Sequence, residues 1–139
     1  MGIWAQYRLR LQRKRLRWRA FRRRRDLAPV IDRTAEITPG DILIFVTLRN
    51  ERVRLPYFLR YYRTLGISHF LVVDNGSTDG SRGYLAMQPD VTVWSTEASY
   101  KASRFGADWM NWLLMRHGRG HWCLTVDADE FFIYPFCDT

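Results

Sequence analysis

Two aspartates late in the sequence, Asp127 and Asp129, have the residue type and the spacing to bind a metal ion. They directly follow the apolar run at residues 122–126, and acids in that position are not typical of ordinary surface charge. Carboxylate oxygens are the ligands that hard divalent cations prefer, and a bound cation would neutralise the diphosphate of a leaving group. An isolated Asp-x-Asp pair also arises by chance in solvated turns, so the preceding apolar run is what favours a metal site.

Polar residues also follow the apolar runs earlier in the chain, among them Thr47, Asn50, Glu51 and Asp74. The Asn-Gly and Asp-Gly dipeptides within residues 74–81 predict tight turns whatever the function. Asp74, at the tip of an apolar run, could in addition accept hydrogen bonds from a nucleobase or a ribose. These residue types indicate a polar, acidic binding edge.

The elements that must position these residues follow from the hydrophobic pattern. Buried strands are expected at 42–46, 70–73, 91–94 and 122–126. Helices are expected at 55–65, in a short stretch ending near residue 88, and at 100–117, whereas 28–40 is expected to be a loop. Strands that alternate with helices imply an α/β fold with a mostly parallel sheet. Because ligands bind beyond the carboxyl ends of such strands, we expect the polar residues to converge at one edge.

Three of these segments resemble the motifs of one known family. The sequence VDNGSTDGS at 73–81 resembles the V-D-D/N-G-S-T-D-G-T/S segment of family 2 glycosyltransferases. Asn50 and Glu51, preceded by Arg49, resemble the Asn-Glu pair that closes the family's first strand. The sequence VDADEF at 126–131 resembles the family's D-x-D, in the D-x-D-E-F form of a bacterial subgroup. Order and spacing match from about residue 41 to residue 132, roughly two thirds of the chain.

The resemblance implies a fold and an activity. The fold is a Rossmann-like GT-A nucleotide-sugar-binding fold, of which residues 41–139 would be the N-terminal, donor-binding part. The activity is transfer of a sugar from a nucleoside-diphosphate donor to a hydroxyl of a saccharide or lipid-linked acceptor, usually with inversion. The family's general base lies after its D-x-D, and Thr139 is the last residue here. We therefore expect a truncated chain that lacks the base and whose isolated activity could be nil.

The resemblance also implies which residues contact the nucleotide. Thr47, Asn50 and Glu51 would line the nucleotide pocket, and Asp74 would contact the uracil or other base. Asn75 stands where many members have a second aspartate, so this sequence departs from the usual pattern at the base contact.

The remaining implied roles concern the metal and the phosphates. Asp127 would lie near the ribose or the metal, and Asp129 would hold Mn²⁺ or Mg²⁺ on the diphosphate. Lys101 and Arg104 loosely resemble a K-A-x-x-R stretch that approaches phosphate in the family. An ordinary surface pair explains these two cations equally well.

The N-terminal segment differs in charge from the rest of the chain. The 139 residues have a formal net charge of +8, yet 11 of the 22 cations lie between Arg8 and Arg25, where there is no acid. The remainder carries 11 cations against 14 acids, a net charge of −3. Residues 1–33 are therefore predicted to be a basic amphipathic arm, helical or disordered, ahead of a slightly acidic domain at 41–139.

Within this arm, apolar and aromatic residues recur at helical spacing, at Trp4, Tyr7, Leu11, Trp18 and Phe21, with Lys14 and Arg15 interrupting the stripe. One prediction is contact with an anionic membrane through residues 4–25, and a solvated basic extension is the alternative. Nucleic-acid binding is disfavoured because no recognised reading module follows. No apolar run has the length of a signal peptide or a membrane span, and two cysteines make no disulfide framework. A cytoplasmic protein, peripheral on the inner face of the cell membrane, is expected.

Two other function classes stay open. A nucleotidyltransferase of similar fold would need a glycine-rich basic loop after its first strand, and residues 48–55 contain no glycine. A non-catalytic protein whose arm binds anionic membrane or nucleic acid is the main alternative to a glycosyltransferase. His117 and His121 are expected in loops rather than as a metal pair, and Trp109 and Trp112 are expected in the core.

Overall fold

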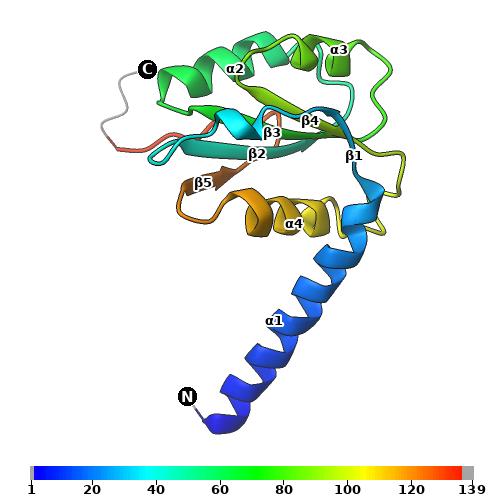
Figure 1. Cartoon of the computed structure of the whole chain (residues 1–139), viewed down its shortest axis with the longest axis vertical. Helices are drawn as coiled ribbons and strands as arrows, with labels where there is room; N and C mark the ends of the chain where they lie inside the picture. The colour runs from blue at the N-terminus through cyan, green and yellow to red at the C-terminus, as the bar shows by residue number, and fades with distance from the viewer. Residues whose placement is uncertain (1, 136–139) are drawn as a thin grey trace.

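The computed structural model describes residues 2–135 as an α/β fold built on one five-stranded sheet (Figure 1). The strands are β1 (Ala28–Ile31), β2 (Ile42–Leu48), β3 (His69–Asp74), β4 (Val91–Ser95) and β5 (Trp122–Thr125). The helices are α1 (Ile3–Arg23), α2 (Leu55–Thr64), α3 (Ser81–Ala86) and α4 (Ala107–His117), with short 3-10 turns η1 (Arg24–Asp26) and η2 (Thr34–Glu36). The predicted α/β class with a mostly parallel sheet is confirmed.

The strand order β1-β4-β3-β2-β5 reverses direction at β2. From β2 the chain steps through α2 to β3 and through α3 to β4, and then α4 carries it back to β5 on the other side of β2. These four strands are parallel to their neighbours, whereas β1 pairs antiparallel with β4 at the edge. In such sheets the crevice at the reversal, outside the carboxyl ends of the strands, is where ligands bind. The topology therefore directs attention to the loops after β2 and β5.

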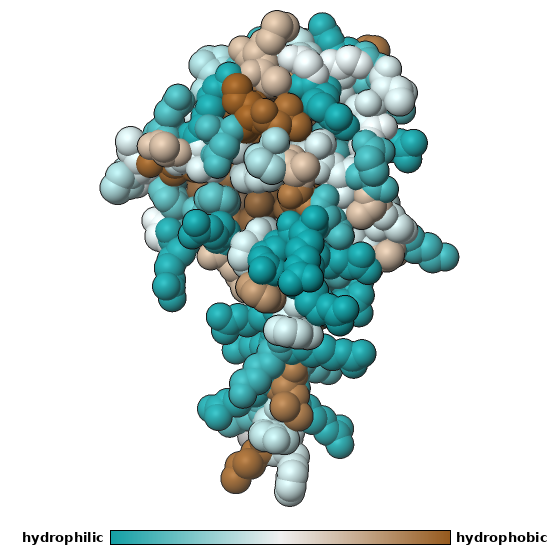
Figure 2. Space-filling view, turned by 45° about the vertical axis from the view of Figure 1, so that its right-hand side comes forward, coloured by the Kyte–Doolittle hydropathy of each residue, from teal (hydrophilic) through white to brown (hydrophobic). Residues whose placement is uncertain are grey.

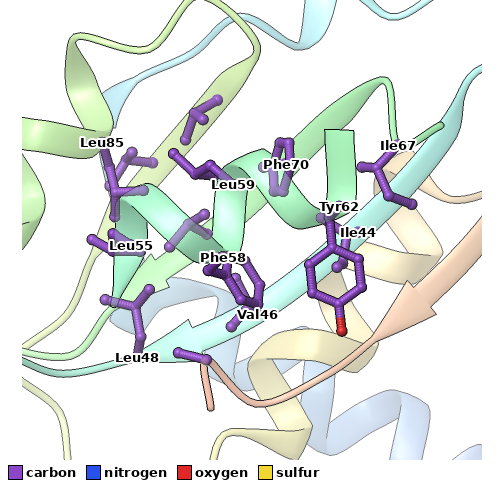
Figure 3. Packing of buried hydrophobic residues seen from close by; sticks show 14 residues of the cluster. Ile44, Val46, Leu48, Leu55, Phe58, Leu59, Tyr62, Ile67, Phe70 and Leu85 are labelled. Carbon is purple, nitrogen blue, oxygen red and sulfur yellow. The ribbon is translucent and has the colours of Figure 1, made fainter. Parts of the chain in front are cut away.

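Helices cover both faces of the sheet, with α2 and α3 on one face and α4 on the other (Figure 1). Successive residues of a strand point to opposite faces, so each strand contributes to two apolar layers. Ile44 and Phe70 pack in the layer that holds Phe58 of α2 (Figure 3). Phe45 packs in the opposite layer with Trp109 of α4. Burial on both faces explains why β2 and β3 are apolar runs without a polar alternation.

Local sequence explains α2 well. Pro56 lies in the first turn, where its missing N–H is not needed, and Leu59 and Tyr62 are fully buried on the apolar side. The chain leaves the helix at Gly66, whose φ of 99° lies in the region that favours glycine. The predicted helix at 55–65 is confirmed.

Two predicted elements were wrong in extent. Helix α4 begins at Ala107 rather than at residue 100, because Arg104, Phe105 and Gly106 all have positive φ (55°, 57° and 80°) and cannot continue a right-handed helix. The predicted loop at 28–40 contains β1, which pairs with β4, so part of the segment assigned to the arm belongs to the sheet. An edge strand of four residues with a proline has too weak a hydrophobic pattern to be recognised locally.

Helix α1 extends away from the sheet and contacts the rest of the chain near its C-terminal end (Figure 1). Ala20 is fully buried there, and Phe21 packs edge-on against Trp112 of α4 with ring centroids 6.0 Å apart. Just after the helix, Asp26 accepts a 3.0 Å hydrogen bond from the indole N–H of Trp109. None of the helices within residues 2–135 is long and apolar enough to cross a membrane.

Candidate functional site at the carboxyl edge of the sheet

The loops after β2 and β3 are joined by hydrogen bonds between their motif residues. The side-chain Oδ1 of Asn50 accepts from the backbone N–H of Thr78 at 2.8 Å, and the Asn50 N–H donates to Oγ of Ser77 at 2.9 Å. The N–H of Glu51 donates to the hydroxyl of Ser81 at 3.0 Å. Asn50 has φ of 55°, a left-handed conformation that asparagine tolerates better than most residues. These contacts make Asn50 a positioning residue that aligns two of the three motifs.

The third motif reaches the same edge because β5 pairs with β2. Thr125 lies opposite Phe45 in the register, so the chain that leaves β5 runs beside the end of β2. A cavity of about 290 Å³ lies between these loops. It is lined by Thr47, Leu48, Arg49, Glu51, Asn75, Tyr100, Asp127, Ala128 and Asp129. Residues from all three motifs thus meet around one space.

The acidic side of this cavity carries mutually repelling carboxylates. Partial desolvation, together with the nearby charges of Glu130 and Asp129, raises the pKa of Asp127 above its usual value. Oε2 of Glu130 accepts a 3.2 Å hydrogen bond from the backbone N–H of Asp127, so the Glu130 carboxylate is turned toward the loop after β5. Within residues 2–135 there is no group of three or more His, Cys, Asp or Glu side chains placed to hold a metal.

Two cavity-lining carboxylates, Asp127 and Asp129, nevertheless fit one mode of cation binding. Mg²⁺ and similar ions are commonly held by one or two carboxylates, with phosphate oxygens and water completing the coordination. A bound cation would offset both the partial desolvation and the neighbouring negative charges that raise the pKa of Asp127. The donor set fits a cation that arrives with a diphosphate, rather than one held by protein ligands alone.

Asp74, which precedes the cavity-lining Asn75, does not itself line the cavity. Its side chain is fully buried, and its Oδ2 accepts from Nε and Nη2 of Arg82 at 2.9 and 2.8 Å and from the Ser77 N–H at 3.2 Å. The hydrogen bond and the charge of Asp74 raise the pKa of Arg82. The other oxygen, Oδ1, has no hydrogen-bond partner among the described residues. The contact of Asp74 with a base stays a prediction, and what the structure shows is an ion pair supporting the 77–81 turn.

Thr47 connects this cavity to a second one. Its hydroxyl is buried without a hydrogen-bond partner among the described residues, and the Cβ that a side chain at Gly106 would add lies 3.0 Å from it. A second cavity of about 290 Å³ shares Thr47 and Asp127 with the first and continues past Phe105 toward α4. The two cavities therefore adjoin at Thr47 and Asp127.

The two cations predicted to approach phosphate do not line either cavity. Lys101 is exposed, and Arg104 donates from Nε to Oδ1 of the buried Asp108 carboxylate at 2.9 Å, with Nη2 in an ion pair 2.9 Å from the same oxygen. Tyr100, a residue that no sequence motif marked as functional, lines the first cavity instead. Burial, and then the charge of Asp127, raises the pKa of this phenol. The placement of Tyr100 depends on the left-handed turn before α4, and Gly106 is the one residue in the local sequence that indicates this turn.

The residues predicted to be structural are mostly so. Trp109 is fully buried and Trp112 is half-buried against α1, which confirms their core assignment. His121 lies outside the helices and its Nδ1 is 2.9 Å from the carbonyl of Asp41. His117, expected in a loop, is instead the last residue of α4, because the helix continues to its cap at Gly118.

Comparison of the chain with protein-family models, with curated proteins and with solved structures found no match in any of the three.

Proposed function

We propose that this chain binds a nucleoside-diphosphate sugar together with Mn²⁺ or Mg²⁺, as the donor-binding part of a family 2-like glycosyltransferase with a GT-A fold. The observation that carries the proposal is the meeting of three motif loops around one cavity at the reversal point of a parallel sheet. Two carboxylates from the third loop, Asp127 and Asp129, face that cavity beside Thr47 at the end of β2. This arrangement supports binding of a nucleotide whose diphosphate carries a metal ion.

The roles of the residues follow from their positions. Asp127 and Asp129 would hold the cation, which when bound neutralises charge on the diphosphate leaving group. Asn75 and Glu51 border the cavity and would contact the nucleoside. The two amide N–H bonds of Asn75 are directed at the carbonyls of Thr96 and Ala98, at 3.3 and 3.0 Å, so its carbonyl oxygen is the atom offered to a ligand.

The proposal concerns donor binding and assigns no residue to deprotonation of the acceptor hydroxyl. Lys101 and Arg104 are left out of the phosphate site, since Arg104 is held by Asp108. Asn50 acts through the loop that it fixes, and Asp74 acts through Arg82 and the turn at 77–81.

Calorimetric titration of the full chain with UDP, GDP and dTDP, each with and without Mn²⁺, tests the proposal. We expect one nucleotide to bind in a metal-dependent way and Asp129→Asn to weaken that binding at least tenfold, about 1.4 kcal/mol. Glu36→Gln also removes an exposed charge, but Glu36 does not line the cavity, so this variant should leave binding unchanged. Equal binding by the wild type and Asp129→Asn would remove Asp129 from the metal site, and no binding of any nucleotide would overturn the proposal.

A further inference from the structure

Helix α1 presents an apolar stripe that the rest of the chain does not cover. Ile3, Trp4, Tyr7, Leu11 and Trp18 are between 48 and 83% exposed, and Phe21 is 40% exposed. The positions 4, 7, 11, 18 and 21 are separated by three or four residues or by a full heptad, so they lie on one face of the helix. Figure 2 shows hydrophilic side chains surrounding α1, with hydrophobic groups exposed between them toward its free end.

The stripe continues onto the body of the protein. Trp18 stacks on Phe21 with centroids 5.9 Å apart, and Phe21 meets Trp112 of α4 edge-on. An apolar groove of about 600 Å³ lies between these two helices, with Met115 at its other wall. Lys14, Arg17 and Arg116 also line it. An exposed aromatic stripe and a groove bordered by cations therefore form one continuous surface.

A second copy of this chain is a poor occupant for that surface. The heptad spacing would suit a coiled coil, but the positions beside the stripe are Arg8, Arg15 and Arg22 on one side and Arg10 and Arg17 on the other. A parallel pair would bring Arg15 and Arg22 of one copy against Arg10 and Arg17 of the other. An antiparallel pair would bring each flank against the same flank of the other copy, again arginine against arginine. Within one helix the arginines also repel at i,i+4 spacing, so an anionic partner would stabilise α1 itself.

We propose that α1 and the α1–α4 groove bind the surface of an anionic phospholipid bilayer. Tryptophan and tyrosine suit the headgroup depth, with an apolar ring body and a polar edge, and long arginine side chains can keep their charge at the phosphates. Each cation near an anionic leaflet adds about 1 kcal/mol of attraction, and the segment from Arg8 to Arg25 has 11 cations and no acid. The charge and the aromatic stripe thus favour one occupant, and the site is independent of the proposed nucleotide site.

Vesicle pelleting of the full chain tests this with a matched pair of variants. Leu11 lies in the stripe and is 48% exposed, whereas Leu9 lies on the opposite face and is 41% exposed. Leu11→Ser should weaken binding to vesicles of phosphatidylcholine with about a quarter phosphatidylglycerol by about tenfold, the effect of exposing one leucine. Leu9→Ser carries the same loss of helix propensity and should bind as the wild type does.

Three results would overturn the proposal. One is no binding to the anionic vesicles, and another is an equal loss in the two leucine variants, which would mean that the stripe is not the contact. The third is wild-type binding that disappears at about 0.5 M NaCl and is outcompeted by duplex DNA, while both leucine variants bind as the wild type does. That result would mean that the arm binds nucleic acid through charge alone. Binding that persists in salt and responds only to Leu11→Ser supports the membrane surface.

Discussion

Replacement of Arg82 by methionine tests how much the ion pair with the buried Asp74 carboxylate stabilises the fold. The Asp74 carboxylate is fully buried, and two of the three hydrogen bonds to its Oδ2 come from the Arg82 guanidinium. Arg82→Met keeps the side-chain stem but leaves that carboxylate with a single 3.2 Å bond from the Ser77 N–H. Breaking a buried pair in this way costs about 3–5 kcal/mol. Because the arginine side chain is 36% exposed, we expect the lower end, about 3 kcal/mol.

Urea unfolding at neutral pH measures this loss, and an unchanged dependence on urea would show that the denatured state is the same. A loss of that size corresponds to a fall in Tm of about 12 °C for a chain of this length. Glu97 provides the matched control, since its carboxylate lies 3.6 Å from the same guanidinium but is 82% exposed. Glu97→Gln should change the free energy of unfolding by less than about 0.5 kcal/mol. If Arg82→Met costs no more than Glu97→Gln, the argument from burial is refuted.

Three further predictions concern stability. Burial is the main cause that lowers the pKa values of His69 and His117, so below the ordinary histidine pKa of 6.5 the unfolded chain binds more protons than the folded one. The free energy of unfolding should therefore fall as the pH drops below that value, and it should fall less steeply in His117→Gln. An unchanged pH dependence in that variant would contradict this. Gly106→Ala should lower the free energy of unfolding by at least about 1 kcal/mol, because φ at this position is 80° and the new Cβ would lie 3.0 Å from the hydroxyl of Thr47. The control Gly83→Ala, inside α3 with open space around it, should raise that free energy by about 0.5 kcal/mol. Equal effects of the two substitutions in urea unfolding would exclude the steric reason. Asn50→Ala should lower the free energy of unfolding by about 2 kcal/mol, because alanine tolerates the left-handed φ poorly and the side-chain hydrogen bond is lost. Asn50→Gly loses only the hydrogen bond and should cost about half as much. Thermal unfolding measures both losses, and equal losses would mean that φ contributes nothing.

The binding experiment adds a pH dependence that links stability to the site. The raised pKa of Asp127 means that protons compete with a cation for this carboxylate at a higher pH than for an ordinary aspartate. Metal-dependent nucleotide binding should therefore weaken on acidification, and Glu130→Gln, which removes one source of the repulsion, should move that loss to lower pH. An identical pH profile in the variant would show that Glu130 does not act on Asp127.

The sequence by itself determined four of the five strands, all but β1, and most of the helices. The apolar runs at β2, β3 and β4 were recognisable because a strand buried on both faces needs only local composition to specify it. Turn dipeptides and strand-end acids likewise indicated where polar loops must lie, since those preferences act within a few residues. The boundary of α4 was misjudged because the apolar spacing of Phe105 and Trp109 continues across a left-handed turn.

Only the tertiary structure decided which loops meet. The pairing of β5 with β2 joins segments that are far apart in the sequence, and it alone brings Asp127 beside Thr47. The same packing separates residues that the sequence treated alike, because Asp74 is buried against Arg82 while Asp129 faces the cavity. Local patterns fix what each strand is made of, but the free energy of burying several helices on a sheet at once decides which strands become neighbours, and hence which side chains share a site.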